Sequence, residues 1–325
     1  MNLSKWSDTI LFSTLKILIV VFSVYFIYSK VISRPDFDEM AQNVSDTVKD
    51  PGNYSTIFVI VFLMVLNWLI ETAKWKLLLK NICPVTWLRG FRSVLSGVTI
   101  SVFTPNRMGE FAGRVLHLES GTRIKAAIAS VIGSMNQLLI TVVAGGIGLL
   151  ASLSDFDSSE SLLFRVKFLL ILAGMLAAII IYFKIPFLSR LGDFFSALKK
   201  INLYTKVFAL YAFGDLLKLT FWSACRYLIF TFQFYLFLQL FGIDLEYSEA
   251  MRVISIIYLV MAVVPSIALS ELTVRGSVAL YFLTPLTANT AGIIASTSLL
   301  WLVNLIIPAV FGSLAAFYFR FNKWL

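Results

Sequence analysis

Long apolar stretches separated by short polar ones make up most of this chain. A membrane-spanning helix needs about 20 mostly apolar residues, because each helical residue adds only about 1.5 Å of length. Six stretches meet this requirement, so the pattern predicts six spanning helices. They are Leu11–Ile32, Tyr54–Leu79, Ala126–Leu153, Leu162–Phe183, Thr220–Phe241 and Thr290–Phe319.

Two further apolar stretches, Val94–Leu118 and Val253–Leu283, are interrupted near their middles by Pro105 and Pro265. Proline disrupts the hydrogen bonds of a helix interior. Broken backbone is tolerated at membrane depth only where it is buried in protein or faces a water-filled cavity. We therefore expect two re-entrant helical hairpins. The predicted fold class is an all-α polytopic membrane protein with six spanning helices and two re-entrant hairpins.

The charges of the loops predict the orientation of the chain. Segments assigned to the inside hold seventeen Lys or Arg, whereas segments assigned to the outside hold three, with eleven Asp or Glu. Basic loops stay in the cytoplasm, so both termini are predicted there. The inside segments are Lys5, Lys74–Lys125, Lys184–Lys206 and Arg320–Lys323, and the outside segments are Ser33–Asn53, Ser154–Ser161 and Gly242–Arg252.

The order of elements repeats as span, span, hairpin, span. Three spans per repeat is an odd number, so the second repeat must be inverted, with the hairpins entering from opposite sides. Within one membrane domain we expect a first half (1–183, hairpin 94–118), a connector (184–206) and a second half (207–325, hairpin 253–283), with the fourth span (162–183) belonging to the second repeat. Lys184–Ile201 fits either an interfacial amphipathic helix or a linker helix packed on the bundle.

Composition excludes several classes of function. Of 325 residues, 59% are hydrophobic and 14% are charged, too few charges to cover a soluble protein of this size. The net charge of +9 fits basic loops beside anionic lipids, so no nucleic-acid partner is expected. With one histidine, two cysteines, no acidic metal-binding cluster and no glycine-rich phosphate loop, the chain is predicted to have no catalytic residue, metal or cofactor, and not to be an enzyme.

The two interrupted stretches share an unusual motif, a proline followed by Glu-x-x-x-Arg. It comprises Glu110 and Arg114 after Pro105, and Glu271 and Arg275 after Pro265. One such pair is explained by an i,i+4 salt bridge near a helix N-terminus. Two pairs at corresponding breaks favour a functional polar site, because ionisable groups at membrane depth are costly. Arg107 lies at the first break, where a helix beginning near Met108 would present its positive end to an anion.

Ionisable residues also occur inside the second and fifth spans. Asn67, Glu71 and Lys74 share one helical face, and Lys74 is expected to reach the cytoplasmic surface. Arg226 lies in the middle of the fifth span and is expected to contact a carboxylate, with Glu71, Glu110 and Glu271 as candidates. The candidate substrate-binding residues are Glu71, Arg107, Glu110, Arg114, Arg226, Glu271 and Arg275.

Three segments resemble the lysylphosphatidylglycerol synthase transmembrane-region family, also called flippase-like: NWLIETAKW (Asn67–Trp75), GVTISVFTPNRMGEFAGR (Gly97–Arg114) and VPSIALSELTVRG (Val264–Gly276). The resemblance implies lipid translocation between leaflets, or handling of a lipid-linked intermediate, in a bacterial plasma membrane. The residues that match the family's motif are Pro105, Glu110 and Arg114. The family's cytoplasmic synthase domain is absent, so synthase activity is not expected. The second motif departs from the family's Pro-Gly-Gly form.

The sequence therefore predicts a flippase-like transporter of a lipid or lipid-linked amphiphile with a charged head group, with membrane lipids as partners. The expected head group is anionic or polyprenyl-phosphate-linked. One alternative is a proton-coupled transporter of a small polar solute, marked by a closed aqueous vestibule. Another is a non-transporting subunit of envelope assembly, marked by a filled interior. The pattern predicts no particular oligomeric state.

Overall fold

The computed structural model describes residues 37–104, 107–156, 162–187, 206–264 and 268–317, a part of the chain that is helical and contains no strand. The α-helices are α2 (Phe37–Lys49), α3 (Tyr54–Leu79), α4 (Trp87–Ser101), α5 (Gly109–Val115), α6 (Arg123–Phe156), α7 (Leu162–Phe183), α10 (Phe213–Leu240), α11 (Tyr247–Val263), α12 (Ala268–Leu283), α13 (Thr290–Trp301) and α14 (Ile307–Phe317). Short 3₁₀ turns are η2 (Pro51–Asn53), η3 (Ser120–Thr122), η4 (Ile185–Phe187) and η6 (Phe208–Leu210), and the π-helix η7 (Leu302–Ile306) joins α13 to α14.

Four helical stretches of the described chain are long and apolar enough to cross a membrane. They are Pro51–Leu79, Ser120–Leu153, Leu162–Phe183 and Thr290–Leu314, and each contains or overlaps a predicted span. The predicted fifth span forms α10, whose 28 residues are less apolar because they include Arg226, Gln233 and Gln239. The predicted first span, Leu11–Ile32, and most of the connector lie outside the described residues. The protein is thus an all-α integral membrane protein.

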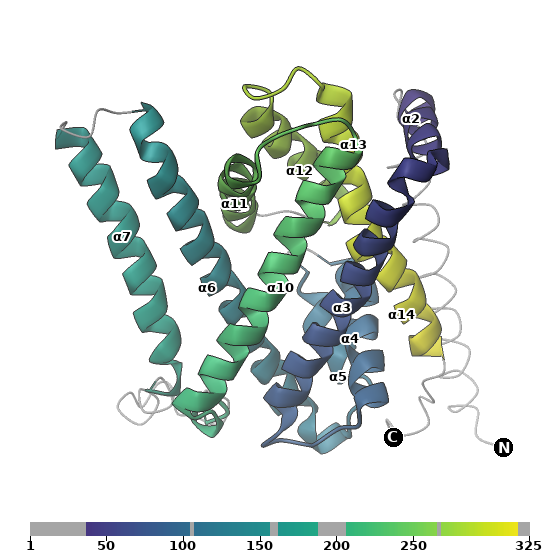
Figure 1. Cartoon of the computed structure of the whole chain (residues 1–325). Coiled ribbons are helices and arrows are strands. Elements are labelled where there is room, and N and C mark those ends of the chain that lie inside the picture. The colour runs from purple at the N-terminus through teal and green to yellow at the C-terminus, as the bar shows by residue number, and fades with distance from the viewer. Residues whose placement is uncertain (1–36, 105–106, 157–161, 188–205, 265–267, 318–325) are drawn as a thin grey trace.

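Both interrupted stretches form two helices with a break between them. The first consists of α4 and α5, separated by residues 102–108, and the second of α11 and α12, separated by residues 264–267. In Figure 1, α4 and α5 lie in the lower half of the molecule and α11 and α12 in the upper half. Pro105 and Pro265 themselves lie outside the described residues.

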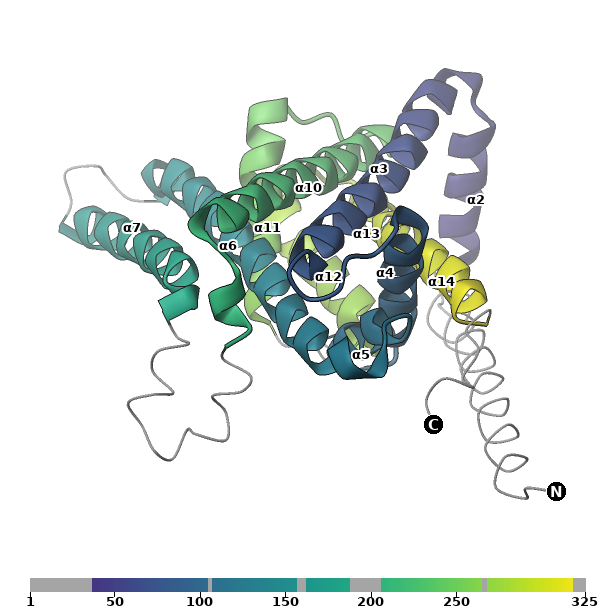
Figure 2. The same ribbon diagram turned by 90° about the horizontal axis from the view of Figure 1, so that it is seen from below.

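Glycines let α5 approach α4 closely. A Cβ added to Gly113 would lie 2.5 Å from the Ser96 carbonyl oxygen, and one added to Gly97 would lie 2.7 Å from Cγ of Arg114. These distances are shorter than van der Waals contact, so only glycine permits this separation of the two helices. Figure 2 shows α5 between α4 and α6 at the lower end of the bundle. The packing fixes the position of α5, which carries Glu110 and Arg114.

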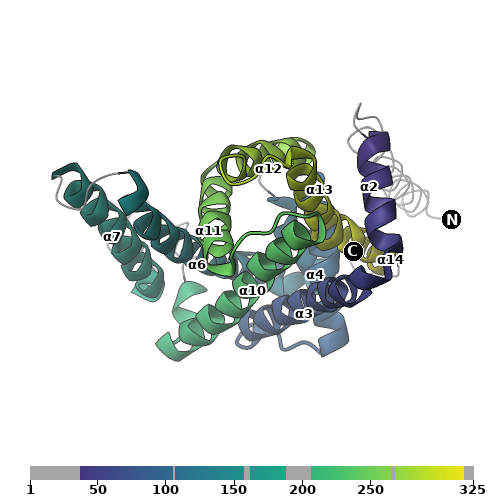
Figure 3. The same cartoon turned by 45° about the horizontal axis from the view of Figure 1, so that its top comes forward.

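Two hydrophobic clusters flank the middle of the bundle. One joins α3, α4, α6 and the start of α10 and includes Trp75 and Leu78, both fully buried. The other joins the end of α10 to α11, α12 and α13, and includes Phe237 and Ile257. Figure 3 shows α11, α12 and α13 grouped beside the end of α10, whereas α7 stands apart and contacts α6. The helix α10 contributes to both clusters and carries Arg226.

Candidate functional site

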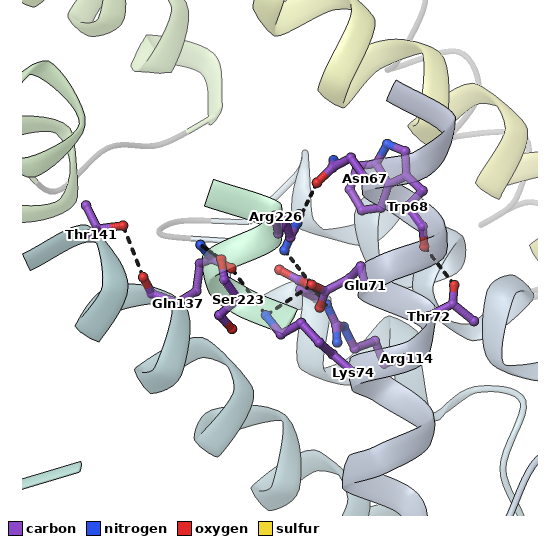
Figure 4. Close-up of polar contacts among 11 residues, drawn as sticks. Asn67, Trp68, Glu71, Thr72, Lys74, Arg114, Gln137, Thr141, Ser223 and Arg226 are labelled. Carbon is purple, nitrogen blue, oxygen red and sulfur yellow. Dashed lines mark hydrogen bonds and ion pairs between the residues drawn. The ribbon is translucent and has the colours of Figure 1, made fainter. Parts of the chain in front are cut away.

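Glu71 on α3 is the centre of a buried cluster of charges (Figure 4). Its Oε1 accepts a hydrogen bond from Arg114 Nη2 at 2.5 Å, and its Oε2 accepts one from Arg226 Nη1 at 2.5 Å. Lys74 Nζ lies 3.3 Å from the same Oε2. These side chains come from α3, α5 and α10, so one carboxylate connects three helices. Arg226 thus contacts Glu71, one of its three expected partners.

The two arginines of this cluster have further partners that fix their orientation. Arg226 Nε donates to Asn67 Oδ1 at 2.9 Å, and its guanidinium lies 5.3 Å from the ring centroid of Trp68. Arg114 also pairs with Glu110 one turn earlier on α5, and lies 5.5 Å from the ring centroid of Trp75. Hydrogen bonds combined with cation–π contacts restrict a guanidinium more than a single ion pair does.

Lys74 corrects a prediction. We expected its side chain to extend to the cytoplasmic surface, but the residue is 1% exposed. It donates a hydrogen bond to Gln137 Oε1 on α6 at 3.2 Å in addition to its ion pair with Glu71. Glu71, one turn earlier on the same face, and Gln137 give the ammonium partners inside the bundle, which offset the cost of burying it.

A second group of charges joins the two breaks. Glu271, in the first turn of α12, is buried and accepts hydrogen bonds from Arg107 Nη2 at 2.7 Å and Arg107 Nε at 3.3 Å. Arg275, one turn further along α12, donates to the same Oε1 atom at 2.9 Å. Arg107 belongs to the break between α4 and α5. The pair Arg107–Glu271 therefore links the two interrupted stretches, 164 residues apart in sequence.

Both Glu-x-x-x-Arg motifs form the i,i+4 salt bridge that a purely structural role would require. Each motif also contacts a residue from another element, since Arg114 contacts Glu71 and Glu271 contacts Arg107. The geometry at the start of α5, the second helix of the first hairpin, does not favour the expected anion site there. The helix α5 has only seven residues, and Glu110 occupies its first turn.

A cavity of about 630 Å³ lies among these side chains. All seven candidate residues and Lys74 line it, giving five Lys or Arg and three Glu, and a formal net charge of +2. Apolar residues complete the wall, including Leu138 of α6 and Val263 at the end of α11. These two residues are 48% and 74% exposed, so the apolar side of the cavity reaches the surface of the molecule.

A family model described as the lysylphosphatidylglycerol synthase TM region matches residues 13–312. The chain belongs to this family. No curated protein and no solved structure matches the chain. The match covers nearly all described residues, so both charge groups and the cavity lie within the transmembrane region that defines the family.

Three further residues line the cavity of this family member: Gln137 on α6, Tyr227 on α10 and Tyr258 on α11. The sequence favours a hydrogen bond between helices over ligand binding for Gln137, and it gives no indication of the two tyrosines. Gln137 also donates a hydrogen bond to the Ser223 carbonyl oxygen of α10 at 3.4 Å. A polar residue in an apolar span is the only sequence signal for Gln137. Tyrosines in apolar helices give no such signal, because their rings pack as readily as other aromatic side chains. In the described residues, no group of His, Cys, Asp and Glu is arranged to hold a metal.

Proposed function

We propose that the protein is a flippase-like transporter that moves an amphiphile with an anionic head group between leaflets, without enzymatic activity. The observation that carries the proposal is the cavity, which combines a net charge of +2 with an apolar side open to the surface. A buried positive charge is costly unless an anion compensates it. The head group would enter the charged region, while acyl chains pass between Leu138 and Val263 into lipid.

The arrangement of the breaks supports an alternating-access mechanism. In this proposal α4–α5 and α11–α12 are re-entrant hairpins of an inverted repeat, entering a bacterial plasma membrane from opposite sides with both termini in the cytoplasm. Their breaks meet through Arg107 and Glu271. Two related halves around one central site provide two equivalent states that open to opposite sides.

The test is translocation of a fluorescent phosphatidylglycerol in reconstituted vesicles, followed by a reagent that quenches the outer leaflet. We expect Glu110→Gln and Arg275→Ala to reduce the rate by about tenfold or more, because each removes a charge-assisted interaction worth about 1.5–3 kcal/mol. The matched controls, Glu119→Gln and Lys80→Ala, alter exposed residues outside the cavity and should translocate normally. Glu110→Gln and Arg275→Ala proteins that fold and translocate like the wild type would contradict the proposal.

The second candidate function is proton-coupled transport of a small polar solute. It is favoured by Glu110, whose side chain lines the cavity and is 24% exposed, so a proton can reach it. Imposing a pH gradient across the vesicles separates the two functions. Acceleration of lipid translocation by the gradient would indicate proton-coupled lipid transport. Solute uptake without lipid translocation would instead support the solute transporter and contradict the flippase. A non-transporting subunit would have every Glu and Arg paired and no cavity. The candidate Glu and Arg residues are all paired, but the cavity disfavours this function.

A further inference from the structure

The two ion-paired carboxylates at the cavity differ in how firmly their cations are held. Glu71 is contacted by Arg114, Arg226 and Lys74, whose side chains are 6%, 14% and 2% exposed. Glu271 is contacted by Arg275, with a side chain 15% exposed, and by Arg107, with a side chain 42% exposed. Arg107 is therefore the cation of the site that solvent or a ligand reaches most easily.

The backbone at Arg107 also distinguishes it. Its φ angle is +57°, and it is the one non-glycine residue with positive φ among the described residues. A non-glycine residue in this region carries backbone strain, and such residues concentrate at ligand-binding and switching positions. No cation–π contact restrains the Arg107 guanidinium, in contrast to Arg114 and Arg226, within the described part of the chain.

Arg275 makes it possible for Arg107 to leave. Both arginines donate to the same Oε1 atom of Glu271, at 2.7 Å and 2.9 Å. Removing the only partner of a buried carboxylate would be strongly unfavourable. Here Glu271 keeps a charged partner on its own helix when Arg107 moves, so the exchange costs much less than exposing an unpaired charge.

We infer that Arg107 exchanges partners during transport. Its guanidinium leaves Glu271 and binds a phosphate head group that carries two negative charges. This inference rests on the proposed function. After the exchange, Glu271 and Arg275 form a neutral pair and Arg107 contributes one positive charge. The two carboxylates of Glu71 and Glu110 neutralise two of the three cations Lys74, Arg114 and Arg226, which leaves a second positive charge. A dianion, as in a phosphomonoester or a diphosphate esterified at both ends, compensates both, whereas a phosphodiester leaves one buried charge uncompensated.

Binding to the purified, detergent-solubilised protein tests the exchange. The probes are dioctanoyl phosphatidic acid, farnesyl monophosphate and dioctanoyl phosphatidylglycerol, titrated by calorimetry at pH 8, where a phosphomonoester with a second pKa of about 6 is a dianion. We expect at least one of the two dianions to bind about tenfold or more tightly than phosphatidylglycerol. Preference for phosphatidic acid indicates a glycerolipid as the natural source, and preference for farnesyl monophosphate indicates an isoprenoid.

Two variants separate partner exchange from simple charge attraction. Glu271→Gln removes the competing carboxylate and should tighten binding of the preferred dianion by about tenfold, the effect expected from one charge-assisted hydrogen bond. Arg107→Gln should weaken it by at least the same factor, while Lys80→Ala should leave it unchanged. Thermal unfolding and gel filtration establish that each variant is folded. Because Arg107 is partly exposed, its variant keeps the test valid even if Glu271→Gln misfolds.

Equal affinity for phosphatidylglycerol and both dianions would overturn the inference, as would unchanged binding to Arg107→Gln or to folded Glu271→Gln. These outcomes concern the exchange of partners only, because the translocation assay tests the proposed function separately. A protein that translocates phosphatidylglycerol but shows no dianion preference contradicts only the exchange. A protein with the expected binding pattern that translocates neither phosphatidylglycerol nor a fluorescent analogue of the preferred dianion contradicts only the proposed function.

Discussion

The charges around Glu71 and the charges around Glu271 each pair a buried carboxylate with two arginines, but the two groups differ in connectivity. Glu71 contacts cations from α3, α5 and α10, and these cations are themselves held by Asn67, Trp68, Trp75, Gln137 and Glu110. Glu271 contacts one arginine of its own helix and one arginine from a break, and the latter is 42% exposed. Every cation of the first group is therefore held by a residue besides Glu71. In the second group, Arg107 is held by Glu271 and is partly exposed.

This difference shows that a buried carboxylate in a membrane bundle can serve two purposes. A carboxylate with three restrained partners holds helices together, because separating them would leave several charges unpaired at once. A carboxylate whose second partner is exposed allows that partner to move at a smaller cost. We therefore expect Glu71 to stabilise the bundle, and in the proposed exchange of partners Glu271 controls access to Arg107.

The largest expected effect is on stability, when Glu71→Gln is compared with Glu271→Gln. Glu71→Gln leaves three buried cations without their shared carboxylate, and we expect it to lower the free energy of unfolding by about 3–5 kcal/mol. Glu271→Gln should cost about 1–2 kcal/mol, because Arg107 can be hydrated. Thermal unfolding in detergent measures both.

The comparison depends on the order of the two effects. Equal shifts of the unfolding temperature would show that the groups are equally important to the bundle. A larger shift for Glu271→Gln would reverse their assigned purposes. Glu119→Gln, at an exposed position, controls for any general effect of removing a carboxylate.

A smaller effect is expected from moving α5, which carries a cation of the first group. Gly113→Ala places a Cβ 2.5 Å from the Ser96 carbonyl oxygen, so α5 must shift away from α4. Overpacking of this kind costs about 1–3 kcal/mol. Gly174→Ala in α7 is the matched control, since nothing lies within 4 Å of its added Cβ and alanine favours helix. The measurement is again thermal unfolding in detergent, and an equal response of the two variants would contradict the close packing described for α4 and α5.

Much of the site could be predicted because charges in apolar sequence are conspicuous. Glu71 and Arg226 stand out inside spans, and all seven candidate residues line one cavity. The breaks were predictable from Pro105 and Pro265, and α5 begins at Gly109, one residue after the expected start. Such features are local, and the energetic cost of a charge at membrane depth makes them informative.

Glu71 was among the expected partners of Arg226, but most contacts between elements could not be predicted, because they depend on how distant helices pack. Arg107 and Glu271 are 164 residues apart, and nothing in either motif indicates their contact. Lys74 was expected at the surface because its position near a helix end permits that conformation. Its contact with Gln137 requires α6 to lie beside α3, a tertiary feature that the hydrophobic pattern does not contain.

The smallest expected effect sets the pH range in which the two groups can be compared. His117 follows α5, and its Nε2 lies 2.8 Å from Ser96 Oγ. Burial, with the positive charges of Arg92 and Arg89 as further causes, lowers the pKa of His117 from 6.5 to about 4. Between these values the unfolded chain binds a proton that the folded protein does not, so stability falls as pH decreases from about 6.5 towards 4.

His117→Gln should remove this contribution, because glutamine keeps a hydrogen-bonding group near Ser96 but does not titrate. We expect the unfolding temperature of the wild type to fall more than that of the variant between pH 7 and pH 5, and the two proteins to respond alike between pH 7 and pH 8. Parallel curves over the whole range would show that His117 is as easily protonated in the folded protein as in the unfolded chain. Above pH 7 the protonation of His117 does not contribute, so differences between Glu71→Gln and Glu271→Gln measured there reflect the two charge groups themselves.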